Sequence, residues 1–194
     1  MDTETFFGEG GLEALARTPA RRAPELFASA SMALSGDRAK LYDEEAKRKS
    51  GISTSADAAA AWSAVRGAAT GAAWLVARLD ATGKTLELVA HGYEGGLTAL
   101  RGHLADDAVS WCAFAFAPGY PYGEGSIKFA FLTCVGSAVS AMKRGKVALQ
   151  KAGCQVALEG TSAEAGVFQG SSEVTDAAVL AELRRNMPKC ELFA

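Results

Sequence analysis

The most constraining feature of this sequence is a pair of long apolar segments, Val109–Phe116 and Lys128–Val135. The first segment alternates two sets of side chains, and both sets are apolar: Trp111, Ala113 and Ala115 against Cys112, Phe114 and Phe116. A strand with two apolar faces is typical of the middle of a sheet that is covered on both sides. We therefore predict that Phe114 and Phe131 are buried in one sheet between two layers of helices.

The segments around this pair carry alternating helix and strand signals. Ser55 is predicted to cap a helix that runs toward Arg66, with Asp57 in the first turn, where a negative charge favours the helix dipole. Apolar spacing and turn residues predict further strands at 72–79, 85–89 and 155–158, and helices at 95–104, 139–152 and 176–186. The expected fold class is α/β, with a central mixed β-sheet sandwiched between helices.

Length and composition predict one domain with an N-terminal appendage. A chain of 194 residues with 49% hydrophobic residues buries a full core without disulfide bonds or a metal ion. We assign residues 53–194 to this domain and residues 1–52 to an arm whose apolar residues are too sparse for a core of their own. The arm is expected to order by docking onto a partner protein through four apolar anchors: Phe6, Phe7, Leu26 and Phe27.

Residues that carry catalysis or bind metal ions are scarce. The four cysteines lie 20 or more residues apart, and Cys112 and Cys134 sit in apolar runs that predict reduced core residues. The two histidines, His91 and His103, have no acid or thiol at ligand spacing. Residues 83–85 resemble the last three residues of a phosphate-binding loop. They lie between two predicted strands, however, and this position favours a hairpin turn. We predict no catalytic residue, metal site or cofactor, and hence a protein that is not an enzyme.

Targeting signals are also missing from the sequence. No apolar segment reaches the roughly 18 residues that a membrane span needs, and the segment MDTETFF contains no secretory signal. The formal net charge of −2 gives no general attraction toward nucleic acid. We therefore expect a cytoplasmic protein without nucleic-acid or membrane partners.

Positive charge is concentrated in one part of the chain. Between Glu124 and Glu159 there is no acidic residue, while five basic residues fall inside: Lys128, Lys143, Arg144, Lys146 and Lys151. Five cations in an otherwise balanced chain predict a local positive patch that binds an acidic protein surface. A solvated helix face is the alternative explanation, because surface helices are commonly charged.

Four segments, taken in order, resemble the coactosin branch of the actin-depolymerising-factor homology (ADF/cofilin) family: Trp74–Asp80, Phe114–Phe116, Lys128–Gly136 and Val139–Lys146. The resemblance implies the ADF-homology fold and binding to actin filaments, with neither a cofactor nor a catalysed reaction. It also matches Lys128, Arg144 and Lys146 to basic residues of the family's central strand and long helix. The arm before Ser55 has no counterpart in the family.

Two hypotheses on function follow. In the first, the protein is a coactosin-like, actin-filament-binding protein of the cytoplasm and cytoskeleton. In the second, the same fold serves as a structural subunit of a larger cytoskeletal assembly, such as a ciliary axoneme, and is anchored there by the N-terminal arm. The acid-free patch suits either hypothesis, because each supplies an acidic protein surface as the partner.

Overall fold

The computed structural model describes residues 51–68, 70–119, 121–122 and 125–193. The predicted arm anchors Phe6, Phe7, Leu26 and Phe27 lie outside these residues. Their role in docking, and the division of the chain at residue 52, therefore stay predictions.

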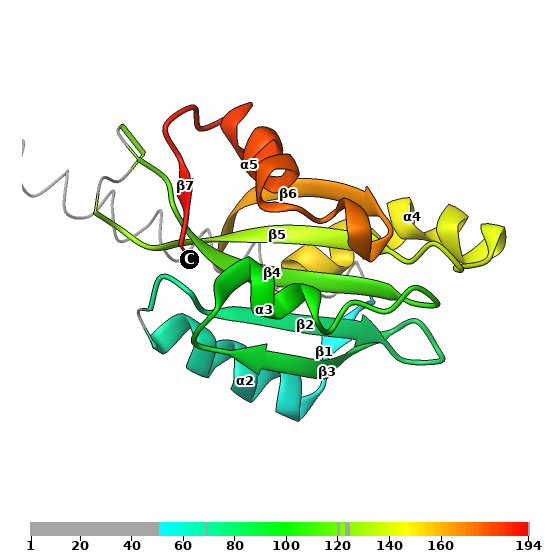
Figure 1. The fold of residues 1–194 in the computed structure, drawn as a ribbon. Coiled ribbons are helices and arrows are strands. Elements are labelled where there is room, and N and C mark those ends of the chain that lie inside the picture. Colours follow the sequence, from blue (N-terminus) through cyan, green and yellow to red (C-terminus); the bar gives the residue numbers. More distant parts are fainter. Residues whose placement is uncertain (1–50, 69, 120, 123–124, 194) are drawn as a thin grey trace, which may run out of the picture. The chain divides into compact units, whose positions relative to one another are not determined.

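A mixed, seven-stranded sheet forms the centre of the described residues (Figure 1). Its strands are β1 (Ser53–Thr54), β2 (Trp74–Leu79), β3 (Thr85–Gly92), β4 (Val109–Ala117), β5 (Lys128–Val135), β6 (Thr161–Gln169) and β7 (Glu191–Leu192). Their order is β1-β3-β2-β4-β5-β6, and β7 pairs with one end of β4. The β1–β3 and β5–β6 pairs are parallel and the others are antiparallel, which confirms the predicted mixed sheet.

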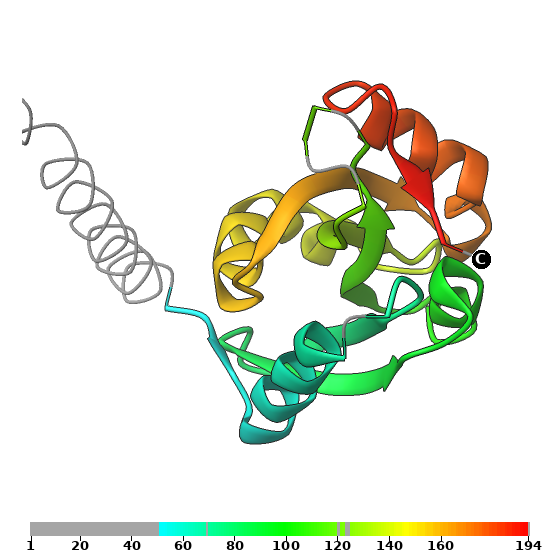
Figure 2. The ribbon, with the colours of Figure 1, turned by 90° about the vertical axis from the view of Figure 1, so that its left-hand side faces the viewer.

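Helices cover both faces of this sheet (Figure 2). They are α2 (Ala56–Gly67), α3 (Gly96–Arg101), α4 (Ala141–Ala157) and α5 (Asp176–Arg184), with a short 3-10 helix, η1 (Ser171–Glu173), before α5. One apolar core lies between the sheet and α2 with α4, and a second lies between the sheet and α3 with α5. The predicted sandwich of helices around a sheet is thus confirmed.

The alternating pattern of the two central strands explains how one sheet serves two cores. In β4, Trp111 packs beneath α2 and α4, whereas Cys112 and Phe114 pack beneath α3 and α5. In β5, Phe131 belongs to the first core and Leu132 to the second. Phe114 and Phe131 are 1% and 0% exposed, as the sequence predicts, and burying such a side chain contributes about 1.5–3 kcal/mol.

Short-range signals set the starts of two helices. The Oγ atom of Ser55 accepts a hydrogen bond from the backbone N–H of Ala58 at 3.2 Å, so Ser55 is the N-cap of α2, as predicted. Thr175 caps α5 in the same way, accepting from the N–H of Ala178 at 3.2 Å. Each cap satisfies an amide group that the first turn of a helix leaves without a partner.

The C-terminal half of α4 corrects one prediction. The strand predicted at Gln155–Leu158 is wrong, because α4 continues through Ala157 and Leu158 is its C-cap. Packing explains the difference, since the side chains of Cys154 and Leu158 are fully buried in the core beneath α4. Burial of one helix face outweighs the local strand signal of this short segment.

The strand β6 is not predicted from the sequence. It pairs in parallel with β5 along Thr161–Gln169. Gly166 lies inside it with φ of +96°, a backbone conformation that favours glycine. The helix predicted at 95–104 is also shorter than expected, because α3 ends at Arg101.

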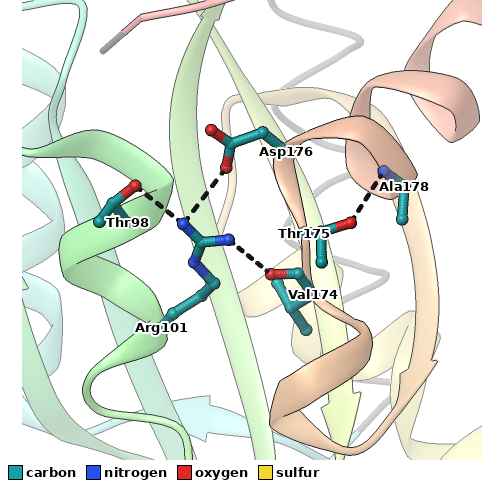
Figure 3. A network of polar contacts seen from close by, with 6 residues as sticks. All are labelled: Thr98, Arg101, Val174, Thr175, Asp176 and Ala178. Atoms are coloured by element: carbon teal, nitrogen blue, oxygen red, sulfur yellow. Dashed lines mark hydrogen bonds and ion pairs between the residues drawn. The ribbon is translucent and has the colours of Figure 1, made fainter.

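Arg101 joins the two helices that cover the second face of the sheet (Figure 3). Its guanidinium donates to Oγ1 of Thr98 at 2.9 Å and to the carbonyl of Val174 at 3.3 Å. The same group lies 3.6 Å from Oδ1 of Asp176. Thr98 belongs to α3, whereas Val174 and Asp176 form the entry to α5. One side chain therefore ties together two helices that are far apart in the sequence.

Gly145 lies inside α4, and a Cβ added there would have nothing within 4 Å. We expect Gly145→Ala to raise the free energy of unfolding by about 0.5–1 kcal/mol, because glycine loses more backbone entropy than alanine when it folds into a helix. Urea-induced unfolding followed by circular dichroism measures this change. Gly136→Ala is the control and should be destabilising, since its Cβ would overlap the backbone carbonyl of Asp106. A loss of stability in Gly145→Ala would contradict the open surroundings of this position.

Candidate protein-binding surface

The five predicted cations are distributed along α4 and the strand before it. Lys128 opens β5, and α4 begins only after β5 has ended. Because β6 is parallel to β5, α4 must run back along the sheet between them. Lys128 therefore lies at the far end of β5 from Lys143 and Lys146. The structure separates the predicted patch into two parts.

Arg144 has a structural role at the start of α4. Its Nε atom donates to the carbonyl of Val139 at 2.8 Å, and its Nη2 atom donates to the carbonyls of Ser137 and Gly136. The N-cap residue, Ser140, makes no side-chain cap hydrogen bond. Arg144 therefore fastens the preceding loop to the helix, and its guanidinium has fewer donors left for a partner.

Lys151 also has a partner within the chain. Its Nζ atom forms an ion pair with the carboxylate of Glu164 on β6. The two side chains are about one-third exposed, so solvent screens the pair and its contribution to stability is small. Among the described residues, the predicted cations that are exposed and have neither an acidic partner nor a hydrogen bond to a backbone carbonyl are Lys128, Lys143 and Lys146.

Two large apolar side chains on α4 point into solvent, and sequence analysis did not identify them as a surface. Met142 is 76% exposed and Leu149 is 84% exposed. They lie two helical turns apart, with Lys146 between them on the same side, while Val147 and Cys154 face the core. Exposed apolar side chains grouped in this way mark interaction sites. We call this group the α4 surface and define it as Met142, Lys143, Lys146 and Leu149.

A cleft of about 440 Å³ lies beside the α4 surface. Its walls come from three segments that are distant in the sequence: the turn after β2, the start of β4 and the first half of α4. The charged residues that line it are Arg78, Asp80, Asp107, Lys143 and Lys146.

Asp80 organises the turn that forms one wall of this cleft. Its Oδ2 atom accepts from Oγ1 of Thr82 at 2.7 Å, and its Oδ1 atom accepts from the backbone N–H groups of Lys84 at 2.9 Å and Thr85 at 3.1 Å. These hydrogen bonds, first of all the one from Thr82, lower the pKa of Asp80 to about 2. The carboxylate is therefore ionised at neutral pH. The turn between β2 and β3 is the predicted hairpin.

Side chains that often take part in catalysis have packing roles here. All four cysteines are buried and free, and burial raises the pKa of Cys134 to about 11 and that of Cys154 to about 12. The ring of His103 stacks on Trp74 with centroids 5.1 Å apart. In the part of the chain that the structure describes, no group of three or more His, Cys, Asp or Glu side chains is arranged to hold a metal ion. The helices of that part are too short or too polar to cross a membrane.

Comparisons with known proteins bear on the fold. Residues 51–184 match the family of cofilin/tropomyosin-type actin-binding proteins. No match is found among curated protein sequences.

Solved structures with a similar fold include human coactosin-like protein, with a TM-score of 0.57 and 21% identity over 69% of this chain and 89% of that chain. Mouse coactosin, an actin filament binding protein, has a TM-score of 0.53 and 20% identity over 70% of this chain and 92% of its own. Cofilin from Streptomyces griseoflavus has a TM-score of 0.55 and 15% identity over 69% and 98%. These similarities show a shared fold.

Proposed function

The chain belongs to the family of cofilin/tropomyosin-type actin-binding proteins, and on that premise we propose that it is a non-catalytic, coactosin-like protein that binds actin filaments through the α4 surface. The observation that carries this proposal is the exposed apolar pair of Met142 and Leu149, which is flanked by Lys143 and Lys146. Mouse coactosin, which has the same fold, is described as an actin filament binding protein. The proposed location is the cytoskeleton of the cytoplasm.

The two kinds of side chain in the α4 surface have different tasks. Burial of Met142 and Leu149 against a partner would remove apolar area from water, at roughly 25 cal/mol per Å². Lys143 and Lys146 would favour an acidic partner and accelerate the encounter with it. Lys128 adds a cation at the other end of β5. Arg144 and Lys151 belong to the proposed site with smaller contributions, because both have partners within the chain.

Co-sedimentation of the full-length protein with actin filaments tests this proposal. We expect saturable binding whose affinity falls as the ionic strength rises, since added salt screens charges at an exposed surface. Binding that is unaffected by salt would argue against a role for the lysines. The absence of co-sedimentation at low ionic strength would overturn the assignment of actin filaments as the partner.

A second candidate function is a structural subunit of a larger cytoskeletal assembly, such as a ciliary axoneme, in which residues 1–52 anchor the domain formed by residues 53–194. The observation that favours it is the internal engagement of Arg144 and Lys151, which leaves fewer cations for actin than the sequence predicts. Co-sedimentation with microtubules, run beside the actin experiment, separates the two functions. Retention by microtubules and not by actin filaments would favour the second.

A further inference from the structure

The three tryptophans of the chain differ in the hydrogen bonds of their indole rings. The Nε1–H group of Trp62 donates to the carbonyl of Glu159 at 2.8 Å, and that of Trp74 donates to the carbonyl of Glu94 at 2.9 Å. The Nε1–H group of Trp111 is buried and has no hydrogen-bond partner among the described residues. Such groups are rare in folded proteins, because an unpaired buried donor has lost its hydrogen bonds to water without replacement.

A second unpaired polar group lies next to Trp111. The hydroxyl of Thr133 also has no partner among the described residues, and Thr133 is directly opposite Trp111 in the register of β4 and β5. Both residues are fully buried. Trp111 is in addition one of the residues that line the cleft beside the α4 surface. The two unpaired groups are therefore buried behind the wall of the cleft, and Trp111 forms part of that wall.

Other residues of the lining supply hydrogen-bond donors to the cleft. Lys143 and Lys146 line it and have no acidic partner among the described residues, and the side-chain amide of Gln150 lies on the same wall. Arg78 is already engaged, since its guanidinium donates to the carbonyl of His103 at 2.9 Å. Ammonium groups have no acceptor capacity, so an occupant with negatively charged oxygen atoms suits the two lysines best.

Two carboxylates in the lining decide which anion fits. Asp80 is ionised but uses its oxygen atoms within its own turn, whereas Asp107 is exposed at the rim. Both carboxylates would repel a phosphate dianion more strongly than a singly charged anion. A peptide carboxylate carries a single negative charge, and the backbone N–H groups beside it can donate to Asp107. We propose that this cleft binds an acidic side chain from a peptide segment of a partner protein.

This site shares Lys143 and Lys146 with the α4 surface but does not depend on the binding of actin filaments. The cleft lies to one side of the helix and is formed with the turn at Asp80, whereas Met142 and Leu149 are exposed on α4 itself. If both sites are used, an acidic peptide in the cleft competes with a filament for the same two lysines.

Nuclear magnetic resonance of the ¹⁵N-labelled full-length protein tests the proposal, with the indole resonances assigned through bonds. The probe is the peptide acetyl-Gly-Glu-Glu-Gly-amide, and its neutral counterpart is acetyl-Gly-Gln-Gln-Gly-amide. The acidic peptide should shift the Trp111 indole resonance in a saturable manner and leave those of Trp62 and Trp74 in place. The combined variant Lys143→Gln, Lys146→Gln should weaken binding at least tenfold, whereas Lys128→Gln, outside the cleft, should change it less than twofold.

Inorganic phosphate and glutarate, titrated separately, identify the class of ligand. Weaker binding of both than of the acidic peptide supports a peptide site. Phosphate or glutarate that shifts the Trp111 resonance at equal or lower concentration than the peptide would overturn it. So would a Trp111 resonance that is unmoved by the acidic peptide at millimolar concentration, or equal responses to the acidic and neutral peptides. None of these outcomes is decided by whether actin filaments bind.

Discussion

Replacing Lys143 and Lys146 together with glutamate is expected to lower the affinity for actin filaments at least about tenfold, or ~1.4 kcal/mol. Both side chains are exposed and have no acidic partner among the described residues, so the change removes two attractions and introduces two repulsions at an acidic surface. The fold should be unaffected, because neither side chain contributes to a core. Co-sedimentation at several salt concentrations gives the dissociation constants.

The control for net charge reverses two cations on the other side of the sheet: Arg185, which pairs with Glu182 at 2.8 Å, and Lys189, beyond the end of α5. It changes the net charge of the protein by the same amount and leaves the α4 surface intact. We expect its affinity for filaments to lie within about twofold of the wild type. Equal losses in the two double variants would mean that overall charge, and not the α4 surface, governs binding. Equal affinity of all three proteins would assign Lys143 and Lys146 to a solvated helix face.

Phe131→Ala is expected to lower the free energy of unfolding by about 3–5 kcal/mol, which is a large share of the stability of a typical domain. The phenyl ring is fully buried in the core beneath α2 and α4, and it stacks on Trp111 with centroids 6.2 Å apart. Its strand is hydrogen-bonded on both sides, opposite Ala113 and Glu164, so the surroundings have little freedom to close a cavity. Urea-induced unfolding followed by circular dichroism measures the loss.

Val167→Ala in the neighbouring strand β6 is the control for this experiment. Its side chain is 42% exposed, so the substitution removes little buried surface, and we expect a change within about 0.5 kcal/mol. Similar losses for Phe131→Ala and Val167→Ala would show that the central sheet does not depend on the packing of its inner side chains. A normal stability of Phe131→Ala would contradict the position of this ring in the core.

The elements that could be predicted from the sequence are those with their own local signal. The two apolar sets of side chains in Val109–Ala117 define a strand with two buried faces, whatever the rest of the chain does. Ser55 lies at the distance from Ala58 that a helix cap requires, and the residues at 80–84 form a hairpin turn through the side chain of Asp80. In each case the interacting groups lie within a few residues of one another.

The elements that were predicted wrongly or missed depend on partners elsewhere in the chain. The segment Thr161–Gln169 is rich in alanine and glycine and has a weak strand signal, yet it pairs along the length of β5. Conversely, the strand predicted at Gln155–Leu158 is the end of a helix and its C-cap, because burial of Cys154 and Leu158 holds this segment against the core. Backbone hydrogen bonds to a strand more than 25 residues away outweigh the intrinsic preferences of short segments.

The sequence by itself determined the family, the sheet with its two helical layers, and the presence of an acid-free basic segment. Only the tertiary structure decided which of those cations are available, because the partners of Arg144 and Lys151 are loop carbonyls and a carboxylate on another strand. It also decided that Val147 and Cys154 face the core while Met142 and Leu149 face solvent, although both pairs have the same seven-residue spacing. The physical reason is that spacing defines the faces of a helix, whereas the sheet on which it packs selects the face that is buried.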